Sequence, residues 1–115
     1  MRVLAIDDDR AALEIRKLLL ERAGHIVTMA TNAVEARAAF GQCSPELVLT
    51  DLRLPELEDG LALIREFHER ARMIVLCGSD ADLQGREEAS MVETVFVKPM
   101  RSEELVRWMA TNARE

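Results

Sequence analysis

Residues 47–51 read Leu-Val-Leu-Thr-Asp, a short apolar run that ends in a carboxylate, and Leu52-Arg53-Leu54-Pro55 follows directly. A run of this length and composition is typical of a buried strand. Two further apolar runs also end in charged residues: residues 3–6 in Asp7-Asp8-Asp9, and residues 95–97 in Lys98. The carboxyl ends of parallel strands meet at one edge of a sheet, where α/β proteins bind ligands. We therefore expect these acids and this base to gather around a cation and a small anion.

The length of the chain, residues 1–115, is typical of one domain. Apolar residues make up 49% of it and aromatic residues only 3%, so an aliphatic core is expected. The formal net charge of −6 opposes direct binding to nucleic acid. The sequence has no apolar run of about 18 residues and no secretory signal pattern, so neither a membrane span nor export is expected. Cys43 and Cys77 are interpreted as reduced thiols of a cytoplasmic protein.

Short apolar runs alternate with amphipathic segments, a pattern typical of βα units and a parallel sheet. The predicted strands are residues 3–6, 26–29, 47–50, 73–77 and 94–97. The predicted helices are residues 10–23, a segment from a cap at Thr31 or Asn32 to about residue 40, residues 61–70, and a last helix capped by Ser102. Residues 80–93 are polar and interrupted by Gly85, and we predict only a short, poorly packed helix there.

The first helix has an apolar stripe that sets its expected orientation. The residues at helical spacing are Ala12, Ile15, Leu19 and Ala23. This stripe predicts that Arg16 lies largely off the buried face. Asp9, just before the helix, is expected to be its N-cap rather than a metal ligand.

Together these features resemble the receiver domain of two-component response regulators. The residues that carry the resemblance are Asp7-Asp8, Asp51, Leu54-Pro55, Gly60 and Lys98-Pro99. The resemblance covers essentially the whole chain. It implies an α/β fold of the flavodoxin-like type: a doubly wound (βα)5 unit whose five-stranded parallel sheet has the strand order 2-1-3-4-5.

The resemblance also implies a site and a chemistry. Asp51 is expected to be the phosphoacceptor, a carboxylate nucleophile that forms an aspartyl phosphate. Mg²⁺ is expected as the cofactor, with Asp8 and Asp51 as direct ligands, Asp7 acting through water, and the backbone carbonyl of Arg53 completing the protein's share. Lys98 is expected to neutralise the charge of the phosphoryl group from the opposite side.

Four features depart from the pattern of the family. Cys77 stands where relatives usually have Thr or Ser, and a thiol is a weak hydrogen-bond donor to a phosphoryl group. Ser79 could substitute if the loop shifts. Val95 stands where relatives have Tyr or Phe, and Phe96 has the opposite strand parity. The loop 55–60 is one residue longer than usual, and the stretch 77–98 is one residue shorter. These departures leave the acids and Lys98 intact, so the chemistry of phosphorylation is expected to be separable from the conformational change that signals it.

The favoured hypothesis is a phosphoacceptor receiver domain, not an enzyme in its own right. Its expected partners are a sensor histidine kinase or a phosphotransfer protein, with an output domain or a downstream protein as the receiver of the signal. The alternative is a pseudo-receiver that acts as a constitutive docking module, which Cys77 and Val95 motivate. A small phosphohydrolase is less favoured, because no second acid near Asp51 is evident that could activate water.

Overall fold

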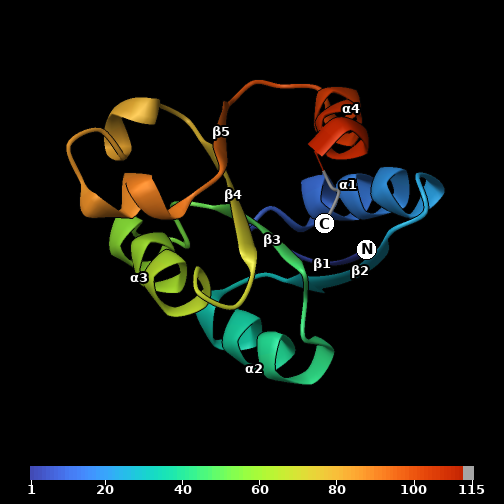
Figure 1. The fold of residues 1–115 in the computed structure, drawn as a ribbon, viewed down its shortest axis with the longest axis horizontal. Helices are drawn as coiled ribbons and strands as arrows, with labels where there is room; N and C mark the ends of the chain where they lie inside the picture. Colours follow the sequence, from blue (N-terminus) through green and yellow to red (C-terminus); the bar gives the residue numbers. More distant parts are fainter. Residues whose placement is uncertain (113–115) are drawn as a thin grey trace.

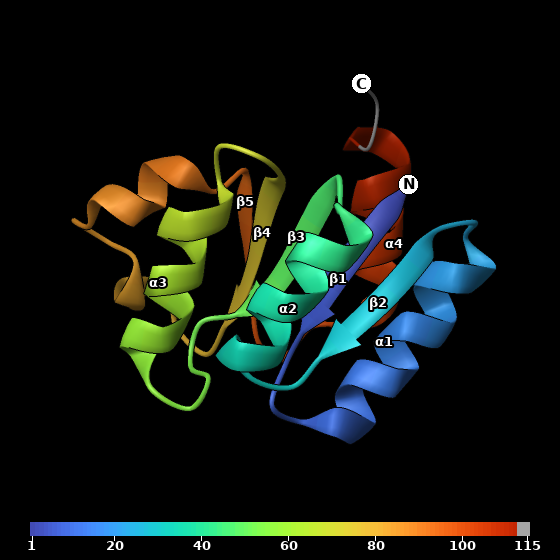
Figure 2. The ribbon, with the colours of Figure 1, turned by 90° about the horizontal axis from the view of Figure 1, so that it is seen from below.

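A single parallel sheet forms the centre of the molecule. The structure is a computed structural model and describes residues 1–112. The strands are β1 (Arg2–Ile6), β2 (Ile26–Ala30), β3 (Leu47–Asp51), β4 (Arg72–Cys77) and β5 (Thr94–Val97). They pair in the order β2-β1-β3-β4-β5, all parallel, as Figure 2 shows. The predicted fold class, a doubly wound five-stranded sheet of the flavodoxin-like type with this strand order, is confirmed.

Helices cover both faces of the sheet. They are α1 (Arg10–Arg22), α2 (Ala33–Cys43), α3 (Leu57–Phe67) and α4 (Ser102–Asn112), with two short 3₁₀ segments, η1 (Asp80–Asp82) and η2 (Glu87–Met91). In Figure 1, α1 and α4 lie on one face, and α2 and α3 on the other. None of the helices within residues 1–112 has the length and hydrophobicity that crossing a lipid bilayer requires.

Two aliphatic cores follow from the alternation of side chains along the strands. Val48 and Val75 point to the core beneath α2 and α3, which also holds the stacked rings of Phe40 and Phe67, with centroids 4.1 Å apart. Leu47 and Leu49 point to the core beneath α1 and α4. The three central strands, β1, β3 and β4, are therefore buried on both faces, as is typical of parallel sheets.

The same alternation separates two residues near the end of β5. Val95 packs against the core of α2 and α3, whereas Phe96 packs on the opposite face, edge-on to Trp108 with ring centroids 6.3 Å apart. The predicted opposite parity of Val95 and Phe96 is confirmed, and Trp108 is partly buried against the core beneath α1 and α4.

The predicted orientation of α1 is wrong by one residue. The buried residues of this helix are Leu13, Arg16 and Leu20, whereas Ile15 is 59% exposed. A helical period fits both stripes equally well, and the position of Asp7 beneath the helix favours the one that contains Arg16. Asp9 is the N-cap, as expected, since its side chain accepts a hydrogen bond from the N–H of Ala12 at 3.2 Å.

Helix α3 begins four residues earlier than predicted, at Leu57 instead of residue 61. Glu56 and Asp59 form a reciprocal capping box that starts the helix. Gly60 is buried against the backbone of Leu52, and a Cβ there would lie 1.9 Å from the carbonyl oxygen of Leu52. Gly60 therefore has a steric role: its missing side chain lets α3 approach the chain that leaves β3.

Residues 80–93 do not form the short α-helix that was predicted. They contain η1 and η2, separated by a turn in which Gly85 has φ +75°. Few apolar residues are available to pack such a helix, and Leu83 is the buried one. Ion pairs from elsewhere hold the segment instead: Arg53 pairs with Asp82 at 3.2 Å, and Arg65 with Glu88 at 2.6 Å.

Candidate functional site

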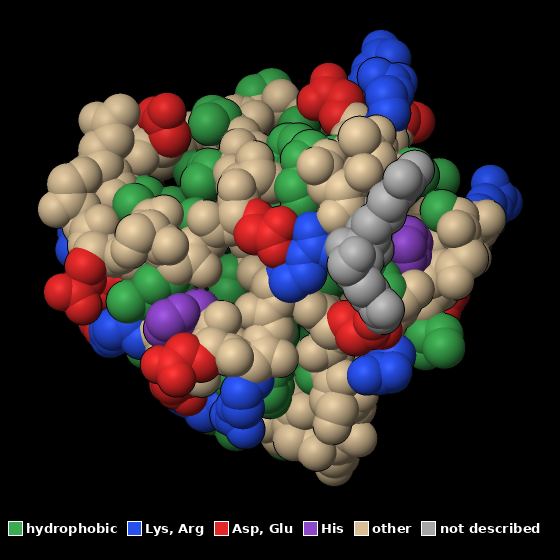
Figure 3. Space-filling model, in the orientation of Figure 1, with side chains coloured by type: hydrophobic (Ala, Val, Ile, Leu, Met, Phe, Trp, Pro, Cys, Tyr) green, Lys and Arg blue, Asp and Glu red, His purple; other side chains and the backbone are tan. Residues whose placement is uncertain are grey.

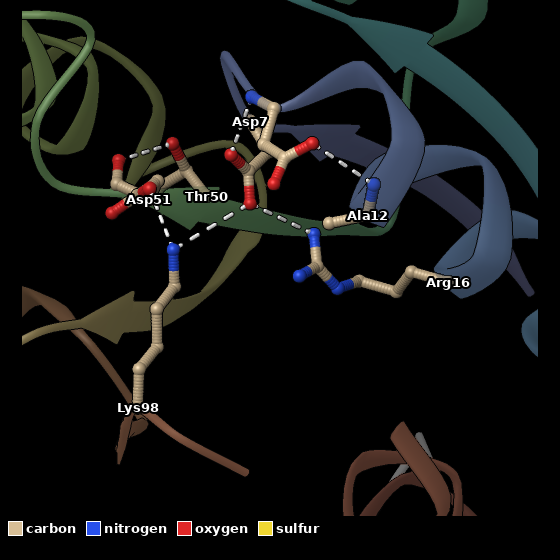
Figure 4. Close-up of polar contacts among 7 residues, drawn as sticks. Asp7, Ala12, Arg16, Thr50, Asp51 and Lys98 are labelled. Carbon is tan, nitrogen blue, oxygen red and sulfur yellow. Dashed lines mark hydrogen bonds and ion pairs between the residues drawn. The ribbon is translucent and has the colours of Figure 1, made fainter. Parts of the chain in front are cut away.

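Asp51 and Lys98 meet at the carboxyl edge of the sheet. Asp51 is the last residue of β3, and Lys98 follows β5 directly. The Nζ of Lys98 donates a hydrogen bond to Oδ2 of Asp51 at 2.8 Å and lies 3.7 Å from Oδ2 of Asp7 (Figure 4). The predicted convergence of the acids after β1 and β3 with the base after β5 is present in the structure.

Three carboxylates at this edge form a cluster that fits a hard divalent cation. One oxygen each from Asp7, Asp8 and Asp51 lies within 4.8 Å of the others. Asp7 is buried, Asp51 is partly buried and Asp8 is exposed, so the cluster opens to solvent on the side of Asp8. Mg²⁺ prefers this kind of site, with one or two carboxylates and several waters.

The clustered charges shift the pKa values of Asp8 and Lys98, the two most accessible residues of the site. Partial burial and then the neighbouring carboxylates of Asp7 and Asp51 raise the pKa of Asp8. Burial by itself would lower the pKa of Lys98, but the hydrogen bond to Asp51 and the charges of Asp51 and Asp7 outweigh it, so the pKa is raised. Lys98 is therefore a permanent cation of this site.

Arg16 is a member of the site that sequence reasoning missed. Its Nη1 donates to Oδ2 of Asp7 at 3.3 Å, and the residue is only 7% exposed (Figure 4). Asp7 itself is 1% exposed. The sequence contains a signal for this, because Leu13, Arg16 and Leu20 also have helical spacing. Charged residues are seldom buried unless they are paired, however, so the spacing alone does not favour a buried stripe that contains Arg16.

Cys77 lies at the end of β4, as predicted, and is buried in the core beneath α2 and α3. Burial, followed by the charges of nearby acids that include Asp51, raises the pKa of its thiol, and a hydrogen bond from the N–H of Ser79 partly opposes this. The hydroxyl of Ser79 accepts from the N–H of Ala81 at 3.2 Å and caps η1. Ser79 thus has a capping role, and its substitution for Cys77 stays a prediction.

Arg53 is an exposed residue of the loop after β3, and its side chain pairs with Asp82. Its expected role as a metal ligand concerns the backbone carbonyl and stays a prediction. The Lys98–Pro99 and Leu54–Pro55 peptide bonds are both cis.

A shallow cavity of about 280 Å³ borders the acidic cluster on the side of α1. Asp7, Arg16, Lys98 and Pro99 are among the residues that line it. A larger depression of about 420 Å³ lies between α1 and α4, and Leu19 and Val106 contribute to its mainly apolar lining. Only the smaller cavity adjoins the carboxylates, so it is the one relevant to their chemistry.

Comparison with protein families and curated sequences gives consistent results. The model of the response regulator receiver domain matches residues 3–110. The chain is 35% identical to the transcriptional regulatory protein AruR of Pseudomonas aeruginosa, over 91% of this chain and 46% of AruR. It is 32% identical to an uncharacterized 14.6 kDa protein of Leptolyngbya boryana, over 93% of this chain and 86% of that protein. The chain thus spans less than half the length of AruR.

Solved structures with this fold include close geometrical matches. The signal receiver domain of a response regulator from Bermanella marisrubri has a TM-score of 0.85 at 26% identity, with 98% of both chains covered. A response regulator from Burkholderia pseudomallei, solved with a phosphorylated aspartic acid, a calcium ion and citrate, has a TM-score of 0.81 at 30% identity. That match covers 97% of this chain and 68% of the other.

Proposed function

This chain belongs to the response regulator receiver domain family, and on that premise we propose that residues 1–115 act as one receiver domain that accepts a phosphoryl group on Asp51 in the presence of Mg²⁺. The observation that carries the proposal is the contact of Lys98 with Asp51 beside the carboxylates of Asp7 and Asp8. The phosphorylated aspartic acid and bound calcium of the Burkholderia relative support the same chemistry.

Each residue of the site has a distinct role in the proposed phosphoryl transfer. A carboxylate oxygen of Asp51 forms the new bond to phosphorus, while the bond from phosphorus to the donor's imidazole nitrogen breaks and its electron pair stays on that nitrogen. Lys98 offsets negative charge on the transferred group. Asp7, Asp8, Asp51 and the backbone carbonyl of Arg53 would hold Mg²⁺, which supplies charge neutralisation to the acids and the phosphoryl oxygens.

Intact-mass spectrometry tests the proposal. Wild-type protein incubated with acetyl phosphate and Mg²⁺ should gain the mass of one phosphoryl group, and Asp51→Asn should gain none. Asp80→Asn is a matched control, since Asp80 is an exposed acid of η1 outside the cluster, and it should be labelled like the wild type. Equal labelling of Asp51→Asn and wild type would falsify the assignment of Asp51.

The proposed partners follow from the same chemistry. A receiver that takes a phosphoryl group from imidazole needs a sensor histidine kinase or a phosphotransfer protein as donor, and we propose a cytoplasmic setting on this basis. AruR is named a transcriptional regulatory protein and is more than twice as long as the matched region, so an output domain or a downstream protein is proposed to read the signal.

Direct binding of nucleic acid by this domain is not part of the proposal. The net charge is −6, and acidic and basic side chains lie next to one another across the face drawn in Figure 3. Binding to phosphates needs clustered Lys and Arg that neutralise them.

A pseudo-receiver that serves as a docking module is the second candidate. Cys77 replaces the expected hydroxyl, and two 3₁₀ segments take the place of a fourth helix before β5. Amide NMR spectra recorded with Mg²⁺, before and after beryllofluoride, separate the two candidates. Shifts that spread from Asp51 to residues 80–97 support a phosphorylation switch, whereas unchanged spectra support constitutive docking.

A further inference from the structure

Both oxygens of the Asp7 carboxylate are already bound by the protein. Oδ1 accepts a hydrogen bond from the N–H of Asp9 at 2.9 Å. Oδ2 lies 3.3 Å from Nη1 of Arg16 and 3.7 Å from Nζ of Lys98, as Figure 4 shows. Asp7 is thus a buried acid whose charge is met by two cations that come from different elements, α1 and the chain after β5.

The two cations differ in their freedom to move. Arg16 is held in the buried stripe of α1 between Leu13 and Leu20. The side chain of Lys98 is 37% exposed, sits on a flexible stem and contacts Asp51 as well as Asp7. Lys98 can therefore turn toward a phosphoryl group on Asp51, whereas Arg16 stays on Asp7.

Arg16 changes the charge balance of the cluster. Asp7, Asp8 and Asp51 together with Lys98 alone would have two more negative charges than positive ones, which a divalent cation would neutralise. Arg16 supplies a further positive charge, so a divalent cation in the unphosphorylated site leaves one positive charge in excess. An aspartyl phosphate carries about one more negative charge than the free carboxylate, since the phosphoryl group contributes about two and the ester bond removes one. With Arg16, the site is therefore neutral only when it holds both the cation and the phosphoryl group.

We propose that Arg16 is a positioning residue that weakens divalent-cation binding to the site. It acts through Asp7, which it holds in place and whose charge it offsets. This effect on cation affinity does not depend on the function proposed above. If Arg16 had only a packing role, its replacement would have the opposite effect: it would loosen the cluster and lower the affinity of the site for the cation.

Mn²⁺ binding, followed by electron paramagnetic resonance without any phosphodonor, measures this effect. Arg16→Met removes the charge and keeps an unbranched apolar chain in the stripe, and Arg16→Gln removes the charge but keeps a donor for Asp7. Both should bind Mn²⁺ about tenfold more tightly than wild type, because each removes the repulsion between one positive charge and the divalent ion, which solvent only partly screens. Arg16→Lys keeps the charge and should stay near the wild-type affinity.

Repeating the titration with saturating beryllofluoride, a singly charged anion that binds the acceptor carboxylate, tests whether Arg16 acts as a simple fixed charge. The added negative charge should raise the Mn²⁺ affinity by a similar factor in every variant, because the attraction between the anion and the cation does not depend on the charge at position 16. Arg22→Met is the matched control: Arg22 is an exposed residue at the far end of α1, and its loss changes the net charge equally. It should leave both affinities unchanged.

The outcomes separate this proposal from that of the phosphoacceptor. Neutral variants that remain folded by circular dichroism but bind Mn²⁺ no more tightly than wild type overturn the role of Arg16, whatever happens to Asp51. The proposed role of Arg16 is also overturned if none of the variants binds Mn²⁺ saturably. If Arg16→Met does not fold, Arg16→Gln decides. Tighter binding in the neutral variants, combined with a wild type that acetyl phosphate does not label, would contradict the phosphoacceptor role alone.

Discussion

Nζ of Lys98 lies 2.8 Å from Oδ2 of Asp51, although 47 positions separate the two residues in the sequence. Strand β3, which ends at Asp51, and β5, which precedes Lys98, are not neighbours, since β4 lies between them. The contact is made beyond the strand ends, where the side chain of Lys98 reaches back across the edge of the sheet. Because Asp51 and Asp7 raise its pKa despite burial, Lys98 stays protonated throughout the physiological range.

The pH dependence of this contact can be predicted. A lysine whose folded pKa is raised contributes stability that is fully present below its ordinary value of 10.5 and is lost as pH rises through the raised value. The unfolding free energy of wild type should exceed that of Lys98→Met by at most about 1 kcal/mol at neutral pH, because solvent screens the pair. Urea denaturation from pH 7 to pH 11.5 should show this difference shrinking only above pH 10.5. Lys17→Met, which breaks an exposed pair with Glu21, should change stability by about 0.3–0.5 kcal/mol. A Lys98 difference that already disappears near pH 8 would contradict the raised pKa.

Asp8 should destabilise the protein when no divalent cation is present. An acid whose folded pKa is raised costs stability above that pKa, and the cost disappears as pH falls below its ordinary value of 3.8. Asp8→Asn should therefore raise the unfolding free energy in EDTA at pH 7 by less than about 1 kcal/mol, since Asp8 is exposed and screened. Thermal unfolding at pH 7 and pH 3.5 should show the gain only at the higher pH, and Mg²⁺ should remove it. Asp9→Asn makes the same charge change at an N-cap that Asn serves equally well, so it should be near neutral. A gain from Asp9→Asn equal to that from Asp8→Asn would assign the effect to net charge instead.

Cys77 is the position at which a hydroxyl could strengthen the binding of a phosphoryl group. A hydroxyl donates a stronger hydrogen bond than a thiol, and a hydrogen bond to a charged group contributes about 1.5–3 kcal/mol. Cys77→Thr should therefore bind beryllofluoride with Mg²⁺ about tenfold more tightly than wild type, as measured by NMR titration. Cys77→Val has nearly the shape of Thr without the hydroxyl and should show no gain. Equal affinities for the Thr and Val variants would mean that this side chain does not reach the phosphoryl group.

Gly60→Ala should be severely destabilising because of one backbone contact. The added Cβ would lie 1.9 Å from the carbonyl oxygen of Leu52, and backbone cannot yield as a flexible side chain can. A loss of about 3 kcal/mol or more in the free energy of unfolding is expected, measured by urea denaturation. Gly41→Ala is the control: Gly41 lies in α2 with open space where the Cβ would be, and alanine there should stabilise the helix by about 0.5–1 kcal/mol. Similar losses at the two glycines would refute the steric role of Gly60.

Glu88 should hold η2 onto α3. It is 7% exposed and accepts a hydrogen bond from Nη1 of Arg65 at 2.6 Å, and this bond is the main cause of its lowered pKa. The stabilisation is therefore present above the ordinary pKa of 4.5 and is lost as pH falls through the lowered value. Glu88→Gln should cost about 1–2 kcal/mol at pH 7 and little at pH 3. Hydrogen exchange of the amides in residues 80–93 should accelerate in this variant at pH 7. Glu87→Gln, an exposed acidic neighbour, should do neither, and identical exchange in the two variants would exclude the anchoring role.

The sequence by itself determined the sheet, the strand ends and the convergence of the acidic and basic residues. Apolar runs that end in charge are a local signal, and in a parallel sheet their carboxyl ends have to share an edge. The N-cap at Asp9 and the parity of Val95 and Phe96 were likewise predictable, because each depends on the residue next to it in the chain.

Only the tertiary structure decided which stripe of α1 is buried, and hence that Arg16 reaches Asp7. Two stripes with the same helical period were possible, and the choice depends on what lies beneath the helix. It also decided that residues 80–93 form 3₁₀ segments, since the acids Asp82 and Glu88 find arginine partners on distant elements. Long-range charge pairing leaves no periodicity in the sequence, because its partners come from separate segments of the chain.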